Sequence, residues 1–309
     1  CLFMDEMKGF EFKEKKAVKE LADDFESMSF QVAFINHAVQ IIKKMKNDNA
    51  KIILTFTSNM ASSGLRELFA QLCKSKFVDA IVTGVGSVEE DLMKTKMPFI
   101  KGSFNMDDKE LHQKGINRIG NILVPNDRYE ALEDELLPFF DKILRLQKEK
   151  KRLLGPSEII YELGKIITDE NSFLYWASKN NIPIFCPAIL DGAFGLQLYY
   201  FKQEHPEMGI DVTADMKAES DLILNAEKTG GIILGGGFAK HHAIGMNIVR
   251  GGFDYAVYVT TSEAYDGSLS GASANEAISW SKIKEDANTV VVHCDATIAF
   301  PIIFCSIIE

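Results

Sequence analysis

The segment from Glu276 to Lys282, with the sequence EAISWSK, combines a carboxylate, an indole ring and a primary amine. If the segment is helical, Glu276 and Trp280 share one face, because residues four apart are neighbours on a helix. An aromatic face beside a carboxylate can hold an ammonium group. Lys282 follows directly, and a lysine in a dry pocket can lose its proton and form imines as a nucleophile. The alternative is a solvated lysine after an amphipathic helix with Trp280 in the core, which is the commoner arrangement.

Two histidines that could take part in catalysis follow a run of three glycines at residues 235–237. His241 and His242 come a few residues later, and a histidine at such a helix start can transfer a proton or hydrogen-bond a substrate. The alternative is a histidine that caps the helix or packs in the core. We interpret His37 and His293 as structural or surface residues.

Small or acidic residues follow six short apolar runs that are rich in strand-forming residues. These runs are Ile52–Phe56, Ala80–Val82, Ile182–Phe185, Ile232–Leu234, Ala256–Val259 and Val290–Val292. In an open parallel sheet, ligands bind beyond the carboxyl ends of the strands. The small polar loop at 57–64 opens a helix, whose free N–H groups and dipole suit a pyrophosphate. The loop at 83–91 offers glycines for close approach and acids for ribose hydroxyls, although it lacks a GxGxxG fingerprint. The pattern alone predicts a nucleotide-binding enzyme.

The apolar runs are near-continuous rather than alternating, which is typical of strands buried on both faces of a parallel sheet. Between them lie segments with helical spacing, such as Phe30, Phe34, Ala38 and Ile41. The alternation predicts an α/β fold: a Rossmann-like, mostly parallel β-sheet with helices on both faces, in a single large domain. We expect that domain to span residues 1–309, with 1–28 as a partial N-terminal extension.

Asn126 is placed to cap a long helix that ends in the basic run Lys148–Arg152. This run is short and stands where positive charge suits the helix dipole, so we interpret it as surface rather than as a nucleic-acid patch. Gly155-Pro156 then breaks the helix and is the best candidate for an internal boundary.

Composition excludes several classes of function. The 309 residues carry 34 Lys and Arg against 44 Asp and Glu, a formal net charge of −10. That charge argues against nucleic-acid binding and favours a cationic partner or substrate. No apolar run approaches the ~20 residues that span a bilayer, so we expect no membrane insertion.

The five cysteines are odd in number and lack CxxC spacing, and no metal-ligand spacing is visible. We therefore expect free thiols, no metal and a reducing, cytoplasmic setting.

Several sequence blocks resemble deoxyhypusine synthases, and the likeness runs from about Asn49 to Phe300. The most specific blocks are GGGFAKHH, from Gly235 to His242, and EAISWSK, from Glu276 to Lys282. The other blocks are Thr57–Asn59, Thr83–Asp91 (TGVGSVEED), Ile116–Pro125 (INRIGNILVP) and Asp254–Tyr258. The segment from Asp266 to Gly271 is similar to that of archaeal members of the family.

The resemblance implies an NAD-dependent transferase. In such an enzyme, spermidine is oxidised to an imine, an enzyme lysine captures the aminobutyl group, and 1,3-diaminopropane leaves. The group then passes to one lysine of translation factor 5A and is reduced to deoxyhypusine. The resemblance also implies a homotetramer and NAD as the cofactor. The choice of NAD over NADP agrees with the sequence, because an acid at the ribose would repel the 2′-phosphate of NADP.

By the same resemblance, Lys282 is the imine-forming lysine and His241 contacts the polyamine. Imine formation needs an unprotonated amine, and burial in a pocket lined by Trp280 would favour that form. The other polyamine-site positions are Glu89, Gly236, Gly267, Ser268, Glu276 and Trp280. The cofactor-binding positions, with Glu90 at the ribose, are Ser58, Asn59, Met60, Ala61, Ser62, Gly84, Val85, Gly86, Glu90, Asp191, Thr261, Ser262, Asp266, Asp295 and Ala296.

This chain has Leu196 and Leu269 where better-known relatives carry acids that hold polyamine nitrogens. Leucine cannot pair with an ammonium, so either Glu263, Glu89 or Glu276 takes over, or the donor is another amine such as agmatine. Three other functions stay open: a homospermidine-type enzyme with putrescine as acceptor, an inactive regulatory paralogue, and an amine dehydrogenase that releases NADH. The retained active-site residues argue against the paralogue, and a dehydrogenase would need no imine-forming lysine.

Overall fold

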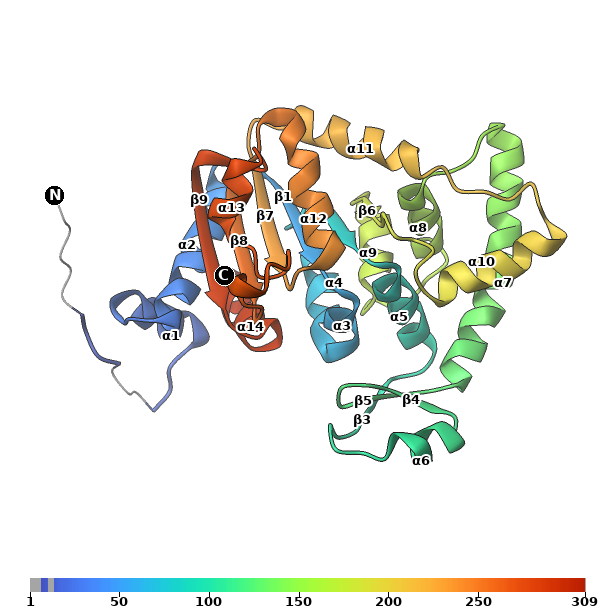
Figure 1. The fold of residues 1–309 in the computed structure, drawn as a ribbon, viewed down its shortest axis with the longest axis horizontal. Helices are drawn as coiled ribbons and strands as arrows, with labels where there is room; N and C mark the ends of the chain where they lie inside the picture. Colours follow the sequence, from blue (N-terminus) through green and yellow to red (C-terminus); the bar gives the residue numbers. More distant parts are fainter. Residues whose placement is uncertain (1–6, 11–13, 309) are drawn as a thin grey trace. The chain divides into compact units, whose positions relative to one another are not determined.

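A computed structural model describes residues 7–10 and 14–308 of the chain (Figure 1). Contacts group the chain into two compact units. Unit 1 comprises Cys1–Phe56 and Ser220–Glu309, and unit 2 comprises Thr57–Glu219. Within the predicted N-terminal extension, Cys1 lies outside the described residues, whereas Val18–Asp24 form helix α1.

Unit 1 contains four parallel strands: β1 (Lys51–Phe56), β7 (Thr229–Leu234), β8 (Phe253–Thr260) and β9 (Ile283–His293). Their order is β1-β7-β8-β9, with parallel pairing at each step. In the register, Leu54 lies opposite Ile232, which lies opposite Val257. Every residue of β7 is buried. The continuous apolar runs therefore form a sheet that is covered on both faces, as their composition predicts.

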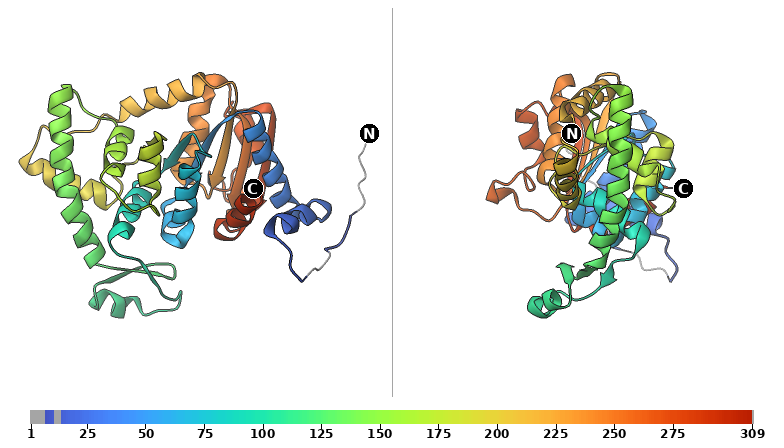
Figure 2. Two further views of the ribbon diagram at one scale, coloured as in Figure 1. Left: turned by 180° about the vertical axis from the view of Figure 1, so that it is seen from behind. Right: turned by 90° about the vertical axis from the view of Figure 1, so that its right-hand side faces the viewer.

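Helices cover both faces of the unit 1 sheet. They are α1, α2 (Gln31–Asn47), α12 (Gly237–Met246), α13 (Ala274–Ser279) and α14 (Ala296–Cys305), with short turns η1 (Phe25–Ser27), η3 (Asn247–Arg250) and η4 (Ala264–Asp266). Helix α12 contacts β1 and β7 and lies in front of them in Figure 1. Helices α2 and α14 contact each other and β8, and α2 lies in front of the sheet in the reversed view of Figure 2.

The helical spacing that begins at Phe30 is only partly a buried stripe. Ala38 and Ile41 are buried on α2, but Phe30 is 91% exposed and Phe34 is 40% exposed. Phe30 precedes the helix with a φ of 63°, so its side chain does not belong to the helical face. The expectation of a core stripe starting at Phe30 is therefore wrong at its first two positions, and Ile35, Val39 and Ile42 take part in the core instead.

Unit 2 contains two parallel strands, β2 (Ala80–Thr83) and β6 (Ile184–Phe185). Its helices are α3 (Ser58–Met60), a π-helical turn η2 (Ala61–Leu65), α4 (Arg66–Lys74), α5 (Val85–Lys96), α7 (Asp127–Lys150), α8 (Pro156–Gly164), α9 (Phe173–Asn180) and α10 (Ala193–Glu204). Helix α11 (Val212–Leu224) carries the chain from unit 2 into unit 1. The predicted α/β class, with parallel strands and helices on both faces of the sheet, is confirmed.

A small antiparallel sheet in unit 2 is absent from the sequence-based expectation. Its strands are β3 (Ile100–Lys101), β4 (Ile116–Ile119) and β5 (Ile122–Pro125), in the order β3-β5-β4, and α6 (Asp108–Gln113) precedes β4. Gly120 and Asn121 form the two-residue turn of the β4–β5 hairpin, a pair typical of such turns. The block from Ile116 to Pro125 is therefore a hairpin, with strands too short for periodicity to reveal.

The predicted long helix is α7, but the Asn126 side chain does not cap it and instead accepts a hydrogen bond from the Asn117 side chain at 2.8 Å. Gly155 directly precedes α8. Gly155-Pro156 thus separates two helices inside unit 2, whereas the units divide near residues 56 and 219. The assignment of 1–309 as one family domain stays a prediction. Cys73, Cys186, Cys294 and Cys305 are free thiols. Among the described residues, we find no helix that is both long enough and apolar enough to span a membrane.

Candidate active site

Helix α13 and the turn that ends it fix the position of Lys282. The Ser273 hydroxyl caps the helix by accepting a hydrogen bond from the Glu276 N–H at 3.2 Å. At the other end, Ser281 has a φ of 57°. Its N–H donates to the Ile278 carbonyl at 2.9 Å, and the Lys282 N–H donates to the Ala277 carbonyl at 3.0 Å. These two bonds form a Schellman motif, so the backbone at Lys282 is hydrogen-bonded in place immediately before β9.

Lys282 lines a pocket of about 240 Å³ in unit 1, together with Glu276, Trp280 and His241. The four side chains that the sequence predicts as catalytic or polyamine-binding here are thus brought together. Trp280 is 65% exposed and its ring centre lies 5.4 Å from Lys282 Nζ. The alternative that Trp280 is a core residue is therefore wrong. A volume of this size is ample for an aliphatic amine chain.

His241 projects from α12 into the same pocket. Partial burial lowers the pKa of His241, and the positive charges of Lys282 and His242 lower it further. The imidazole is therefore mostly neutral at neutral pH and can accept a proton or a hydrogen bond from an amine. By contrast, His37 and His293 are exposed, and His293 Nε2 lies 3.5 Å from Glu263, which agrees with a surface role.

Lys240 and Tyr258 also line this pocket, and neither was predicted as a site residue. Lys240 is only 1% exposed, and its Nζ lies 4.4 Å from the centre of the Tyr258 ring. Burial lowers the pKa of Lys240 to about 8, against an opposing effect of Glu276. The Tyr258 hydroxyl is buried and has no hydrogen-bond partner among the residues that the structure describes. Both residues stand in sequence blocks that carry the family resemblance, which is the signal that could have found them.

Leu269 also lines this pocket, whereas Leu196 lies on α10 in unit 2 and is 51% exposed. Leu269 therefore adds apolar surface to the wall of the pocket that Lys282 lines. Glu276 is the one carboxylate among the residues that line this pocket.

The remaining predicted residues of unit 1 follow β8 and β9 or lie in the turns beside them. Thr261 and Ser262 follow β8, and the Ser262 N–H donates to the Thr260 hydroxyl at 3.1 Å. Asp266 accepts a hydrogen bond from the Ser268 N–H at 2.6 Å, across Gly267. Hydrogen bonding by the Ser268 side chain and then by this N–H lowers the pKa of Asp266. The other predicted positions are Gly236 before α12, and Asp295 and Ala296 at the start of α14.

Asp295 caps α14 by accepting a hydrogen bond from the Thr297 N–H at 2.7 Å. Its carboxylate therefore already has a structural role at a helix N-terminus.

In unit 2, the predicted cofactor loop lies against the start of α5. Gly84 is the N-cap of this helix, and Val85 and Gly86 form its first turn. A Cβ at Gly86 would lie 2.6 Å from Ser58 Oγ, so only glycine lets the two segments approach this closely. The first turn of a helix has N–H groups that attract anions, and here the Ser58 side chain packs directly against that turn.

Glu90 lies on α5 and accepts a hydrogen bond from the Ser62 hydroxyl. Burial raises the pKa of Glu90 to about 7, although the Ser62 bond and the charge of Lys94 act in the opposite direction. The Lys94 ammonium donates to the carbonyls of Ala61 and Ser62 at 2.7 and 2.8 Å. The predicted cofactor residues from Ser58 to Ser62 are thus fastened to α5. Asn59 is exposed and Met60 is buried.

Glu89 is 8% exposed and accepts a hydrogen bond from the Phe194 N–H at 2.8 Å. This bond caps the start of α10, next to the exposed Asp191. Burial raises the pKa of Glu89. The predicted polyamine carboxylate therefore has a structural partner inside unit 2.

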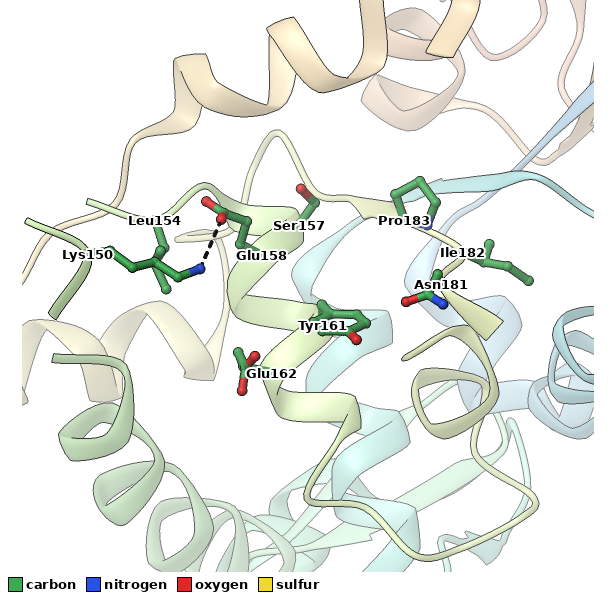
Figure 3. Close-up of a pocket in the computed structure, with 9 residues that line it drawn as sticks. All are labelled: Lys150, Leu154, Ser157, Glu158, Tyr161, Glu162, Asn181, Ile182 and Pro183. Atoms are coloured by element: carbon green, nitrogen blue, oxygen red, sulfur yellow. Dashed lines mark ion pairs between the residues drawn. The ribbon is translucent and has the colours of Figure 1, made fainter. Parts of the chain in front are cut away.

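A second pocket, of about 320 Å³, lies in unit 2 between α8 and the segment before β6, and Figure 3 shows its lining. Glu158 is paired with Lys150 at 3.6 Å and with Arg152 at 2.6 Å, and Glu162 is paired with Lys142 at 2.8 Å. Its acids are thus already neutralised by neighbouring bases, and none of the predicted site residues lines it. Within the described part of the chain, no cluster of three or more His, Cys, Asp or Glu could hold a metal ion.

Sequence comparisons with known proteins match most of the chain to one family. The deoxyhypusine synthase family model matches residues 20–307. A Thermococcus onnurineus protein, assigned as a deoxyhypusine synthase, is 46% identical over 94% of this chain and 90% of its own length. The deoxyhypusine synthase of Senecio vernalis is 42% identical over 96% and 87%.

Solved structures agree with these sequence matches. A crystal structure described as a deoxyhypusine synthase from Entamoeba histolytica superposes with a TM-score of 0.68 and 28% identity, over 97% of this chain and 95% of that one. The complex of AgrE with ornithine and NAD⁺ has a TM-score of 0.54 at 14% identity, over 90% of this chain and 33% of that one, a likeness of fold alone. With this family match, these relatives and its α/β fold, the chain belongs to the deoxyhypusine synthase family of enzymes.

Proposed function

We propose that this enzyme transfers the aminobutyl group of spermidine, with NAD as cofactor, to a specific lysine of translation factor 5A. The observation that carries the proposal is the pocket in which Lys282 lies beside Trp280, Glu276 and His241. This set combines an amine nucleophile, a surface for an ammonium group and a neutral base. The net charge of −10 supports attraction of both a polycationic donor and a basic acceptor loop.

The chain's own residues supply binding, capture and proton transfer. Trp280 and Glu276 hold the ammonium end of the chain, and the buried Tyr258 hydroxyl offers one more hydrogen bond. Once the secondary amine is oxidised to an imine, Lys282 Nζ attacks the imine carbon. The bond from that carbon to the original nitrogen breaks, and 1,3-diaminopropane leaves. Lys282 Nζ gives up both of its amine protons as it becomes the imine nitrogen, and His241 transfers them to the departing nitrogen. The acceptor lysine then displaces Lys282 by the same exchange.

The residues of unit 2 fit a dinucleotide. Gly84 and Gly86 place no side-chain atoms at the start of α5, whose N–H groups suit a phosphate, and Glu90 lies one turn further along the helix. When bound, NAD would accept the hydride in the oxidation and return it in the final reduction. We propose that the NAD-binding positions of unit 2 are Ser58–Ser62, Gly84–Gly86, Glu90 and Asp191. For unit 1 we propose a cofactor role for Thr261, Ser262, Asp266, Asp295 and Ala296, on the family resemblance alone.

The test is an incubation of the purified protein with NAD and spermidine labelled in its aminobutyl group, with and without the purified factor. Release of 1,3-diaminopropane together with labelled factor supports the proposal. Labelling of added putrescine instead indicates a homospermidine-type enzyme, and accumulation of NADH indicates a dehydrogenase. Absence of all three reactions would overturn the proposal and favour a regulatory paralogue.

A different amine donor is the second candidate, and the observation that favours it is Leu269 in the wall of the pocket. An apolar wall binds methylene groups well but cannot pair with a second ammonium. The same assay with agmatine in place of spermidine distinguishes the donors, because faster capture of agmatine would identify it as the substrate. We further propose a homotetramer in the cytoplasm, and light scattering on the purified protein tests the tetramer.

Gly86→Ala is expected to weaken NAD binding by tenfold or more. The new Cβ would lie 2.6 Å from Ser58 Oγ and 2.9 Å from Ser58 Cβ. The loop that carries Ser58 must therefore move away from α5, which changes the proposed phosphate site at the start of that helix. Isothermal titration with NAD measures the effect. The matched control is Gly86→Ala combined with Ser58→Gly, which removes the clashing atoms and should recover part of the affinity. Unchanged affinity for NAD in the Gly86→Ala variant would contradict the proposed phosphate site at the start of α5.

A further inference from the structure

Lys240 lies at the junction between α12 and the turn that precedes α13. Its Nζ donates a hydrogen bond to the Ala272 carbonyl at 2.7 Å and lies 3.5 Å from the Ser270 carbonyl. The side chain is 1% exposed, which is rare for a lysine. A buried amine that meets main-chain carbonyls of another segment joins the two segments, since breaking those bonds would leave buried polar groups unsatisfied.

The same turn is packed closely against the glycines before α12. The Gly237 N–H donates to Ser270 Oγ at 3.0 Å. A Cβ at Gly236 would lie 2.4 Å from Ser270 Oγ and 2.5 Å from its Cα, so the contact requires glycine. The segment that carries Leu269 and leads to α13 therefore packs against the start of α12, and Lys240, one turn later on α12, donates to the same segment.

We propose that Lys240 is a positioning residue that fastens the turn at residues 270–272 to α12 and thereby sets the start of α13, on which Glu276, Trp280 and the Schellman turn at Lys282 depend. Lys240 acts through these residues and takes no part in bond making. Its amine supplies the donors for both carbonyls in either protonation state, because a neutral amine still carries two N–H groups.

We call the hydrogen bonds from Lys240 to the turn at residues 270–272 the Lys240 clamp. The stability of this clamp should vary with pH. The groups that face Lys240 are Glu276 from α13, Tyr258 from β8, and His241 and Lys282, which line the same pocket. With the turn closed, burial holds the pKa of Lys240 near 8, while a turn that opens to water restores the ordinary value of 10.5. The open form therefore binds more protons between these values, so raising the pH through this range favours closure.

Hydrogen exchange of the full chain tests the clamp without any assumption about the reaction. The amides of Gly271 and Ala272 donate within the turn, both to the Ser268 carbonyl at 3.2 Å. Lys240→Met keeps the shape of the side chain but removes its donors, and we expect these amides to exchange at least tenfold faster. The control Lys43→Met, on α2 of the same unit, should leave them unchanged. Wild-type exchange rates for these amides in a Lys240→Met variant with a native circular dichroism spectrum would overturn the proposal.

A pH series on the unmodified protein provides a test that no folding defect can obscure. After correction for intrinsic exchange, protection of the Gly271 and Ala272 amides should rise between about pH 8 and 10.5, by at most tenfold per pH unit. Protection that stays flat or falls across this range would contradict the clamp.

The effect on activity rests on the proposed function. If spermidine is the donor, Lys240→Met should raise its KM at least tenfold, with a smaller change in the rate at saturation. A wild-type enzyme that is inactive with spermidine would refute the proposed function and leave the exchange result standing. A normal KM beside accelerated exchange would refute the link between the turn and the pocket.

Discussion

Lys282→Ala is expected to lower the rate of aminobutyl transfer by at least about 10³-fold, because the variant has no amine to capture the substrate. Lys282→Arg should be equally inactive, since a guanidinium stays protonated and forms no imine. The release of 1,3-diaminopropane and the labelling of the factor measure the loss. Reduction of the wild-type reaction mixture with borohydride should attach an aminobutyl group to a peptide that contains Lys282, and to none in the variant.

The matched control is Lys284→Ala, two residues later in the chain. Lys284 lies on β9 and pairs with Asp254 at 2.5 Å, outside the pocket, so its loss should change the transfer rate by no more than about twofold. An active Lys282→Ala enzyme, or an adduct on a different lysine, would refute the proposed mechanism while leaving family membership intact.

Arg66→Met should destabilise the protein by about 3–5 kcal/mol, because it removes the partner of a buried charge. Asp91 is fully buried and also accepts hydrogen bonds from the Ser172 hydroxyl at 2.6 Å and the Leu174 N–H at 3.0 Å. Arg66 pairs with Asp91 and, at 2.7 Å, with Asp169. Urea unfolding of the variant measures the loss in free energy.

Two comparisons make this stability prediction specific. Lys74→Met removes an exposed pair with Glu170 and should cost less than about 1 kcal/mol. Arg66→Met combined with Asp91→Asn should be less destabilised than Arg66→Met alone, since the double variant has no unpaired carboxylate at the fully buried position 91. Burial raises the pKa of Asp91, and the positive charge of Arg66 opposes that rise. Removing Arg66 should therefore raise the pKa of Asp91 in the folded variant further, above its value in both the folded wild type and the unfolded chain. The single variant should therefore lose less stability at pH 5 than at pH 8, and an equal loss at both would count against a charge effect.

The sequence pattern predicted the parts of this molecule that depend on local composition. Continuous apolar runs at Ile52–Phe56 and Ile232–Leu234 predicted buried parallel strands, because only residues that avoid water on both faces can occupy them. The spacing of Glu276, Trp280 and Lys282 predicted a shared site, since one short segment carries all three. His241 joined them only through the family resemblance.

Features that depend on distant contacts could not be predicted in this way. Nothing in the composition around Lys240 distinguishes a buried lysine from a solvated one, because its burial results from packing against a turn thirty or so residues later in the chain. Phe30 shows the reverse case, an aromatic residue in helical register that lies in solvent because the helix starts after it. The hairpin of β4 and β5 is too short for periodicity, and the roles of the cofactor residues stay predictions.

The shortness of α13 has a consequence for how the enzyme responds to heat. An isolated helix below about 12–15 residues is marginal in water, and α13 has six residues. Its order depends on the cap at Ser273, on the Schellman turn and on contacts with β9, the last strand in the sheet order. Warming should loosen this corner before the sheet itself melts. Catalysis should then fade at temperatures where the protein still looks native to most spectroscopic probes.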